Sequence, residues 1–315
     1  MVRNFDNNQL CSFLNTIGIR TYIGSTGKIF PEKGIKPIEV LNAWLKWLRD
    51  KGAVFHFRHY MKDIRDKAVL LENKTGEFWY SFDTCVLALG GASWSKTGSD
   101  GQWSKILESK GIEVVPFQPA NAGMNCDLKI PGGLYEGTVI KNILLRHHLT
   151  ARKGEITITD YGIEGAPVYY CNRSFREYPE EPVYIDFKPQ FDSNTIEQLL
   201  SASKNSSEGL RQLKLAKVAI EIIKAGLTKE EYTDLQILSE KIKNFPLSIH
   251  SLRPIEEAIS TTGGISWKAV HSDLSLKKLP SVYVCGEMLD WDAPTGGYLL
   301  QGCFASGFHV GTYLT

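Results

Sequence analysis

The stretch SVYVCGEMLDWDAPTGGYLLQGCFASG, Ser281 to Gly307, decides how this chain is expected to fold. Its apolar run Val282 to Cys285 is too short for a helix and has the β-rich character of a buried parallel strand. Gly286-Glu287 places a carboxylate at the carboxyl end of that strand, where open α/β sheets bind ligands. Thr295-Gly296-Gly297 then opens an apolar segment whose first helical turn would offer free backbone N–H groups to a carbonyl or a pyrophosphate.

A second strand followed by glycines occurs earlier, in the segment CVLALGGASWSKTGSDGQW from Cys85 to Trp103. Gly90 and Gly91 remove side chains where a backbone must pass close to something, and Ser99 or Asp100 could cap the helix that follows. A tight strand-to-helix turn without a ligand explains these glycines equally well on their own. Together with the tail, they favour a bound flat ligand.

The glycine fingerprint of dinucleotide-binding proteins does not occur in the sequence. That fingerprint, G-x-G-x-x-G between a strand and a helix, lets the helix N-terminus approach a pyrophosphate. The nearest segment, Gly24 to Gly27, has the wrong spacing. We therefore expect an α/β protein with a discontinuous Rossmann-like domain that is incomplete at its N-terminus.

Composition excludes several classes of protein. Of the 315 residues 43% are apolar and 23% are charged, and the net charge of +1 gives no attraction to nucleic acid or to an anionic membrane. The six cysteines lack C-x-x-C or ligand-like spacing, which indicates reduced core residues and no metal site. No apolar run approaches the roughly 20 residues that span a bilayer, and no signal peptide begins the chain. We expect a cytoplasmic protein without nucleic-acid or membrane partners.

The distribution of helical and strand patterns predicts several domains. The first part of a cofactor-binding domain is expected to be followed by a β-rich inserted domain, a small helical subdomain, a return through the β-rich domain, and the C-terminal part of the first domain. The expected boundaries are 1–116, 117–192, 193–247, 248–278 and 279–315.

Local patterns within the first part are more specific. Ile38 to Asp50 has apolar residues at helical spacing and ends before Gly52, and Ala53 to Phe57 is strand-like. Val69 to Glu72 and Glu77 to Phe82 flank a turn segment and predict a hairpin.

Two glycine clusters could line a substrate pocket, with β-turns as the alternative. They are Tyr161 to Gly165 and Ser260 to Ile265. Glu164 and Tyr161 are the candidate proton-transferring residues, because they lie in a glycine-framed loop that could face a cofactor ring. The absence of G-x-S-x-G, H-E-x-x-H and P-loop motifs leaves redox chemistry carried by a cofactor.

Four blocks resemble bacterial NAD(P)/FAD-dependent oxidoreductase flavoproteins, which include BaiN-like and aminoacetone-oxidase-like proteins. The blocks are ALGGASWSKTGSDG, ITDYGIEG, RPIEEAISTTGGISW and CGEMLDWDAPTGGYLLQGCFASG, and the likeness runs from about Gly18 to the end. The resemblance implies a discontinuous FAD domain into which a β-barrel-like domain and a small helical domain are inserted. In such proteins the N-terminal strand and its glycine motif would lie before Met1, so we expect impaired FAD binding.

The resemblance also implies which residues meet the cofactor. It places Gly90 and Gly91 close to FAD, Gly286 and Glu287 at the ribityl-phosphate region, and the backbone around Met61 at the adenine. It places Thr295, Gly296, Gly297, Tyr298 and Leu299 at the pyrimidine edge of the flavin.

The leading hypothesis is an FAD-dependent oxidoreductase that exchanges a hydride with a small organic substrate, with NAD(P)H or oxygen as the other redox partner. The alternative is a truncated flavoprotein fragment that binds FAD weakly or not at all and has a binding or assembly role. A third hypothesis is a split protein completed by a separate N-terminal polypeptide, in which case Met1 to Gly18 should expose an apolar edge or groove. A homo-oligomer is the other association considered.

Overall fold

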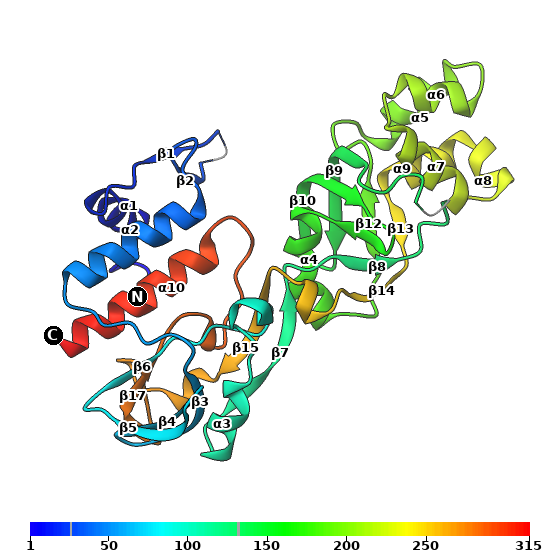
Figure 1. Cartoon of the computed structure of the whole chain (residues 1–315). Helices are drawn as coiled ribbons and strands as arrows, with labels where there is room; N and C mark the ends of the chain where they lie inside the picture. The colour runs from blue at the N-terminus through cyan, green and yellow to red at the C-terminus, as the bar shows by residue number, and fades with distance from the viewer. Residues whose placement is uncertain (26, 131–132) are drawn as a thin grey trace. The chain divides into compact units, whose positions relative to one another are not determined.

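The computed structural model describes residues 1–25, 27–130 and 133–315 of a mixed α/β chain (Figure 1). The chain divides into two compact units. The first unit comprises Met1–Gln118 and Thr262–Thr315, and the second unit, Pro119–Thr261, interrupts it in sequence. The strands β7 (Val114–Ala120) and β15 (Ser260–Ile265), through which the chain enters and leaves the second unit, pair with each other. The expected α/β class is confirmed.

A small parallel pair of strands is the centre of the first unit. Strand β6 (Cys85–Leu87) pairs in parallel with β17 (Leu279–Val284), and β16 (Ser275–Leu276) pairs with the other side of β17. Val282 and Val284 are fully buried and pack in a cluster with Leu87. The apolar tail strand predicted from the sequence is therefore a buried strand.

A three-stranded antiparallel meander completes the β structure of this part of the unit. Its strands are β3 (Tyr60–Arg65), β4 (Ala68–Asn73) and β5 (Gly76–Ser81). Asn73 pairs with Gly76, and the Asn73 side chain accepts a hydrogen bond from the Thr75 N–H at 2.9 Å. The predicted hairpin is confirmed. A short hairpin, β1 (Thr21–Ile23) and β2 (Ile29–Pro31), lies earlier in the chain.

The α-helices in the described part of the first unit are α1 (Asn7–Thr16), α2 (Pro37–Asp50), α3 (Trp103–Ser109) and α10 (Tyr298–Leu314). The Asp6 side chain caps α1, and α2 begins at a proline with Glu39 bonded back to the Lys36 N–H at 2.7 Å. The helix predicted over Ile38 to Asp50 is confirmed. The strand predicted over Ala53 to Phe57 is wrong: the described structure assigns it no strand, because a strand needs a neighbour and none pairs with it.

The second unit is built on a seven-stranded antiparallel sheet of order β13-β12-β9-β10-β11-β8-β14. In chain order its strands are β8 (Met124–Cys126), β9 (Val139–His147), β10 (Thr150–Ile158), β11 (Gly162–Glu164), β12 (Val183–Asp186), β13 (Phe245–Leu247) and β14 (Ile249–Leu252). Helix α4 (Ala166–Glu177) packs on β9 and β10.

The two edge strands of this sheet follow each other in the chain, with only Ser248 between β13 and β14. A sheet whose opposite edges are joined by one residue must curl. Among the described residues no ladder joins β13 to β14, so the sheet does not form a closed barrel. The expected β-barrel-like insertion is therefore a curled, open sheet.

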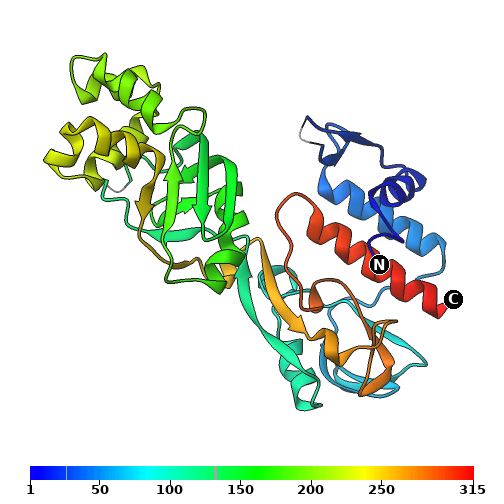
Figure 2. The same ribbon diagram turned by 180° about the vertical axis from the view of Figure 1, so that it is seen from behind.

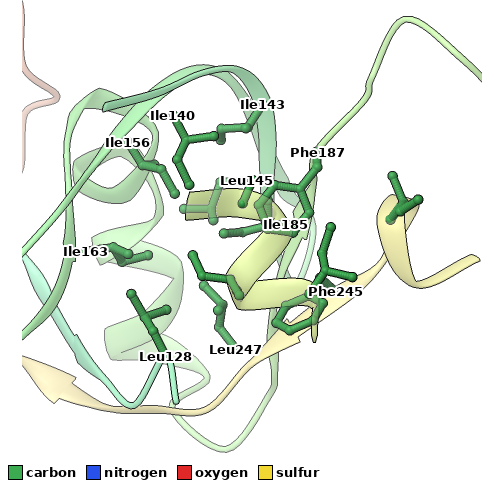
Figure 3. Packing of buried hydrophobic residues seen from close by; sticks show 14 of the residues in the cluster. Leu128, Ile140, Ile143, Leu145, Ile156, Ile163, Ile185, Phe187, Phe245 and Leu247 are labelled. Atoms are coloured by element: carbon green, nitrogen blue, oxygen red, sulfur yellow. The ribbon is translucent and has the colours of Figure 1, made fainter. Parts of the chain in front are cut away.

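The described part of the second unit also has a group of short helices, of which α9 contacts β12 and β13. They are α5 (Ser193–Ser201), α6 (Ser206–Gln212), α7 (Lys217–Gly226), α8 (Lys229–Thr233) and α9 (Leu235–Lys243). Asp192, Asn205, Thr228 and Asp234 cap four of them through their side chains. Helix residues such as Ile196 and Ile222 belong to the same buried cluster as the sheet residues Ile143, Leu145 and Ile185, some of which Figure 3 shows packed together. The helices and the sheet of this unit share one core.

Buried His147 makes the stability of the second unit depend on pH. It is 1% exposed, with Nδ1 2.6 Å from Ser174 Oγ and Nε2 3.2 Å from the Glu181 carbonyl, and burial lowers its pKa. In the unfolded chain the His147 imidazole binds a proton at a higher pH than in the folded protein. The stability that neutral His147 gives the folded protein is therefore complete above about pH 6.5. It is lost as pH falls through the folded pKa, by at most about 1.4 kcal/mol per pH unit.

Urea unfolding measured between pH 5 and 8 checks this expectation. The free energy of unfolding should fall on the acid side in the wild type and should fall less steeply in His147→Gln. An identical pH dependence in both proteins would contradict it.

Candidate functional site

The carboxyl ends of β6 and β17 meet at one edge of the sheet. Leu87 pairs with Val284, and the Cys285 N–H donates to the Leu87 carbonyl at 3.1 Å. Two residues after Leu87, the Leu89 N–H lies 3.1 Å from the sulfur of buried Met288. Because the strands are parallel, the structure brings the segments Gly90-Gly91 and Gly286-Glu287 to the same end of the sheet.

The loop after β6 folds back on itself. Gly90 has φ +78°, and a Cβ there would collide with Ser99 Oγ. The Trp103 indole N–H donates to the Gly90 carbonyl at 3.0 Å, and Ser99 Oγ donates to the Gly91 carbonyl at 3.1 Å. Packing inside the loop therefore already requires Gly90, so this glycine alone is not a sign of a ligand.

The loop after β17 is fixed to helix α10. The Gly286 N–H donates to Ser306 Oγ at 2.9 Å, and its carbonyl accepts from the Trp291 indole at 3.2 Å. A Cβ on Gly302, inside α10, would collide with the Trp291 ring. Sequence reasoning missed Trp291, Gly302 and Ser306; a glycine inside an apolar helix was the available signal for close packing.

Glu287 lies near Cys303 of α10. Burial raises the pKa of the Cys303 thiol to about 12, and the negative charge of Glu287 adds to the effect. The thiol therefore stays neutral at physiological pH, which makes it unsuitable as a nucleophile. In the described residues no three histidine, cysteine or acidic side chains form a group that could hold a metal ion.

The start of α10 is open. Gly296 (φ +117°) and Gly297 (φ +93°) adopt left-handed backbone conformations, and no described side chain caps the first turn. Tyr298 is 62% exposed, and Thr295 and Leu299 are half-buried. The uncapped N–H groups of this 17-residue helix carry the positive end of its dipole. This end of the helix is suited to binding an anion or the carbonyl oxygen of a ligand.

A lysine that the sequence analysis did not single out lies beside this helix start. A Cβ on Gly296 would come within 2.9 Å of Lys28 Cε and 3.2 Å of Lys28 Nζ. Lys28 belongs to the loop between β1 and β2, so nothing local in the sequence connects it with Gly296. The ammonium group adds positive charge to the open helix start.

The other predicted site residues lie elsewhere. Met61 is in β3 of the separate meander, at a bulge, and its side chain packs on the core of the first unit. Tyr161 and Glu164 belong to the second unit. The segment Ser260 to Ile265, expected to be a pocket lining or a turn, is strand β15, and Gly264 lets its backbone pass the Met288 carbonyl without a clash.

Tyr161 and Glu164 form a small polar cluster. The Tyr161 hydroxyl donates to Glu164 Oε2 at 2.9 Å, and the Arg253 guanidinium lies 4.2 Å from the centre of the Tyr161 ring. Arg253 is held by Glu257 at 2.6 and 2.7 Å and by Asn125 at 3.0 Å. Burial, together with the Glu164 carboxylate, raises the pKa of Tyr161 to about 12. Tyr161 therefore keeps its proton at physiological pH.

Comparison with known proteins decides the family. The family described as HI0933-like protein Rossmann domain matches residues 1–313. The chain belongs to this family. Membership of a Rossmann-type flavoprotein oxidoreductase family, expected from the sequence, is confirmed. No helix in the described part of the chain is both long and apolar enough to span a membrane.

Two curated relatives show the range of this similarity. The chain is 27% identical over 251 residues to the 3-dehydro-bile acid delta(4,6)-reductase of Clostridium scindens, which covers 73% of this chain and 61% of the relative. It is 23% identical over 243 residues to the ribosomal RNA dihydrouridine synthase of Escherichia coli, which covers 71% and 58%. The chain thus spans about three fifths of the length of these relatives.

Similar solved structures include the open conformation of a flavocytochrome c3 fumarate reductase, with a TM-score of 0.46 and 12% identity, covering 95% of this chain and 60% of that chain. They also include a 3-ketosteroid delta1-dehydrogenase from Sterolibacterium denitrificans, with a TM-score of 0.42 and 10% identity, covering 88% and 62%. At these TM-scores neither likeness carries an argument about the site.

Contact between Trp291 and Gly302 gives a prediction about the site's rigidity. Gly302→Ala should push the Trp291 ring away from the Gly286 carbonyl and destabilise the protein by about 1 to 3 kcal/mol, as overpacking does. Gly307→Ala in the same helix is the matched control, because a Cβ there meets nothing within 4 Å. That control should be neutral or up to about 1 kcal/mol stabilising. Equal effects of the two substitutions in urea unfolding would contradict the packing argument.

Proposed function

We propose that this flavoprotein binds FAD at the open start of α10 and reduces a carbon–carbon double bond conjugated to a carbonyl group in a small organic substrate. The observation that carries the proposal is that the end of β17 is bonded to α10, through the Gly286 N–H and Ser306, and that the first turn of the same helix is uncapped. We propose NAD(P)H as the reductant of the flavin.

The residues at the start of α10 fit the flavin end of FAD. Left-handed glycines keep side chains away from the helix start, and the first-turn N–H groups face no capping side chain in the described structure. Lys28 adds a positive charge beside Gly296. A flavin carbonyl edge, which gains negative charge on reduction, is chemically matched to such a position. Impaired FAD binding, expected because the sequence lacks the glycine fingerprint, stays a prediction.

When bound, FAD supplies the hydride. In the proposed reaction the residues of this chain would hold FAD. The N–H groups of Tyr298 and Leu299 would donate to its ring edge, and Glu287 would accept hydrogen bonds at the end of β17. Saturating a double bond also needs a proton, for which we propose water as the source.

The substrate class is supported by what the two curated relatives share. One is named a delta(4,6)-reductase of a 3-dehydro bile acid, and the other is named for making dihydrouridine. Both names describe the saturation of a double bond in a ring. The net charge of +1 offers no attraction to RNA, so for this chain we propose a small molecule rather than a nucleic acid.

Removal of the charge on Lys28 tests the proposed position of the cofactor. Lys28→Gln should weaken FAD binding by up to about fivefold, the effect of one exposed charge worth up to about 1 kcal/mol. Lys33→Gln is the matched control, since Lys33 is an exposed lysine close by in the chain. Titration of flavin fluorescence gives both dissociation constants. An equal Kd for Lys28→Gln and wild type would argue against this position.

A further inference from the structure

An open hollow lies beside an irregular part of the sheet in the second unit. Strand β9 pairs with β10 on one side and with β12 on the other, and the three strands lie side by side in both views (Figures 1 and 2). The hollow has a volume of about 610 Å³ and is lined by residues of β9, of β10 and of the turn after β12. Its size lies within the range of roughly 300 to 1,000 Å³ that is typical of small-molecule sites.

A β-bulge forms one wall of the hollow. The ladder between β9 and β10 has a register shift, so that two residues of β9, Lys141 and Asn142, stand opposite Glu155 alone. Asn142 has a left-handed backbone, with φ +57°. Bulges and left-handed residues other than glycine both occur preferentially beside functional sites. The pairing of β9 with β10 does not itself require an extra residue, so the bulge indicates a role beyond holding the two strands together.

A turn at residues 188–191 forms another wall, and a largely buried ion pair holds it in place. Lys243 lies 2.6 Å from the Asp186 carboxylate, and the side chains of the two residues are only 17% and 6% exposed. The same ammonium group donates to the carbonyls of Lys188 and Phe191, the first and last residues of the turn. Hydrogen bonds from a charged group are stronger than neutral ones. This wall is therefore fixed without a ligand.

The lining of the hollow combines opposite charges with amide groups. Its charged side chains are Lys141, Lys153 and Glu155, all exposed, and in the described part of the chain none of them forms an ion pair with another residue. Their charges sum to +1. Asn142 and Gln190 add amide groups, which both donate and accept hydrogen bonds. A ligand with one negative charge and several hydroxyl groups complements this lining.

We propose that the hollow binds a small hydroxylated monocarboxylate. The ammonium groups of Lys141 and Lys153 attract its carboxylate, and the amides of Asn142 and Gln190 bind its hydroxyl groups. A singly charged anion is favoured over phosphate, because the negative charge of Glu155 opposes a second negative charge on the ligand. The lining residues all belong to the second unit, so the inference does not depend on the proposed redox chemistry.

Equilibrium dialysis of the full chain against radiolabelled gluconate, a hydroxy acid with a single carboxylate, tests the inference. Gluconate should bind saturably. Glucose, which has the hydroxyl groups without the charge, should compete about fivefold more weakly or worse, since the attraction of the lysines is lost. Inorganic phosphate should also compete more weakly than gluconate. The absence of saturable binding, equal competition by glucose, or stronger competition by phosphate would each overturn the proposal.

Lysine variants locate the bound anion. Lys141→Gln and Lys153→Gln should each weaken gluconate binding by up to about fivefold, the effect of removing one exposed charge. Lys141→Arg keeps the charge and should bind as the wild type does. Lys204→Gln is the matched control, because Lys204 is an exposed lysine of the second unit that does not line the hollow. Its affinity for gluconate should not change.

Replacement of Glu155 separates binding from a purely structural role. Glu155→Gln removes the opposing charge and should strengthen gluconate binding by up to about fivefold. Damage to the fold does not produce a gain of affinity in one variant and a loss in its neighbours. Because these side chains are exposed, all variants should keep the urea unfolding transition of the wild type. Equal affinity of the lysine variants, Glu155→Gln and wild type for gluconate would contradict the proposal.

Discussion

The parallel pairing of β6 with β17 is the constraint on which the candidate site depends. It is a short ladder, with three registered pairs from Cys85 to Leu87. Yet it joins segments at opposite ends of the sequence and brings both strand ends to one edge of the sheet. Since each strand end leads into a glycine, backbone rather than side chains forms the surface at this edge. The contacts of the loops after β6 and β17 can form one site only because this ladder holds the two strands together.

Helix α10 connects that ladder to the site. Ser306 and Trp291 fix Gly286 to the helix from opposite sides, through its N–H and its carbonyl. The open start of the same helix is therefore held at a set position relative to the end of β17. The uncapped helix start and the glycine strand end are thus connected through the same helix.

The two units differ in how many of their apolar helix residues are buried. In the second unit one cluster of buried residues unites the curled sheet, α4 and the five short helices. In the first unit the buried cluster draws on the strands and α3, while α1 and α2 contribute no buried residue. Amphipathic helices gain most of their stability from packing. The helices α1 and α2 of the first unit therefore bury less than a helix of the second unit such as α7.

Much of the fold and of the candidate site could be predicted from the sequence where the pattern lies within one short segment. The apolar run before Gly286 predicted a strand, and the helical spacing from Ile38 predicted α2. The strand expected over residues 53–57 failed because pairing depends on a distant neighbour, which composition does not reveal. The fold likewise brings Lys28 next to Gly296 and Trp291 next to Gly302, although the members of each pair are separated in the sequence. For Tyr161 and Glu164 the sequence supplied the pair through their glycine-framed loop, and the structure added the hydrogen bond between them.

The most direct measurement of the central claim is amide hydrogen exchange of the chain with and without saturating FAD. The account predicts that FAD slows exchange at Tyr298 and Leu299, whose N–H groups are uncapped, and at residues 286–287 after β17. Exchange in the helices of the second unit should not change. If FAD leaves the start of α10 unprotected, or protects only residues outside the first unit, the cofactor does not bind at this surface and the account is wrong.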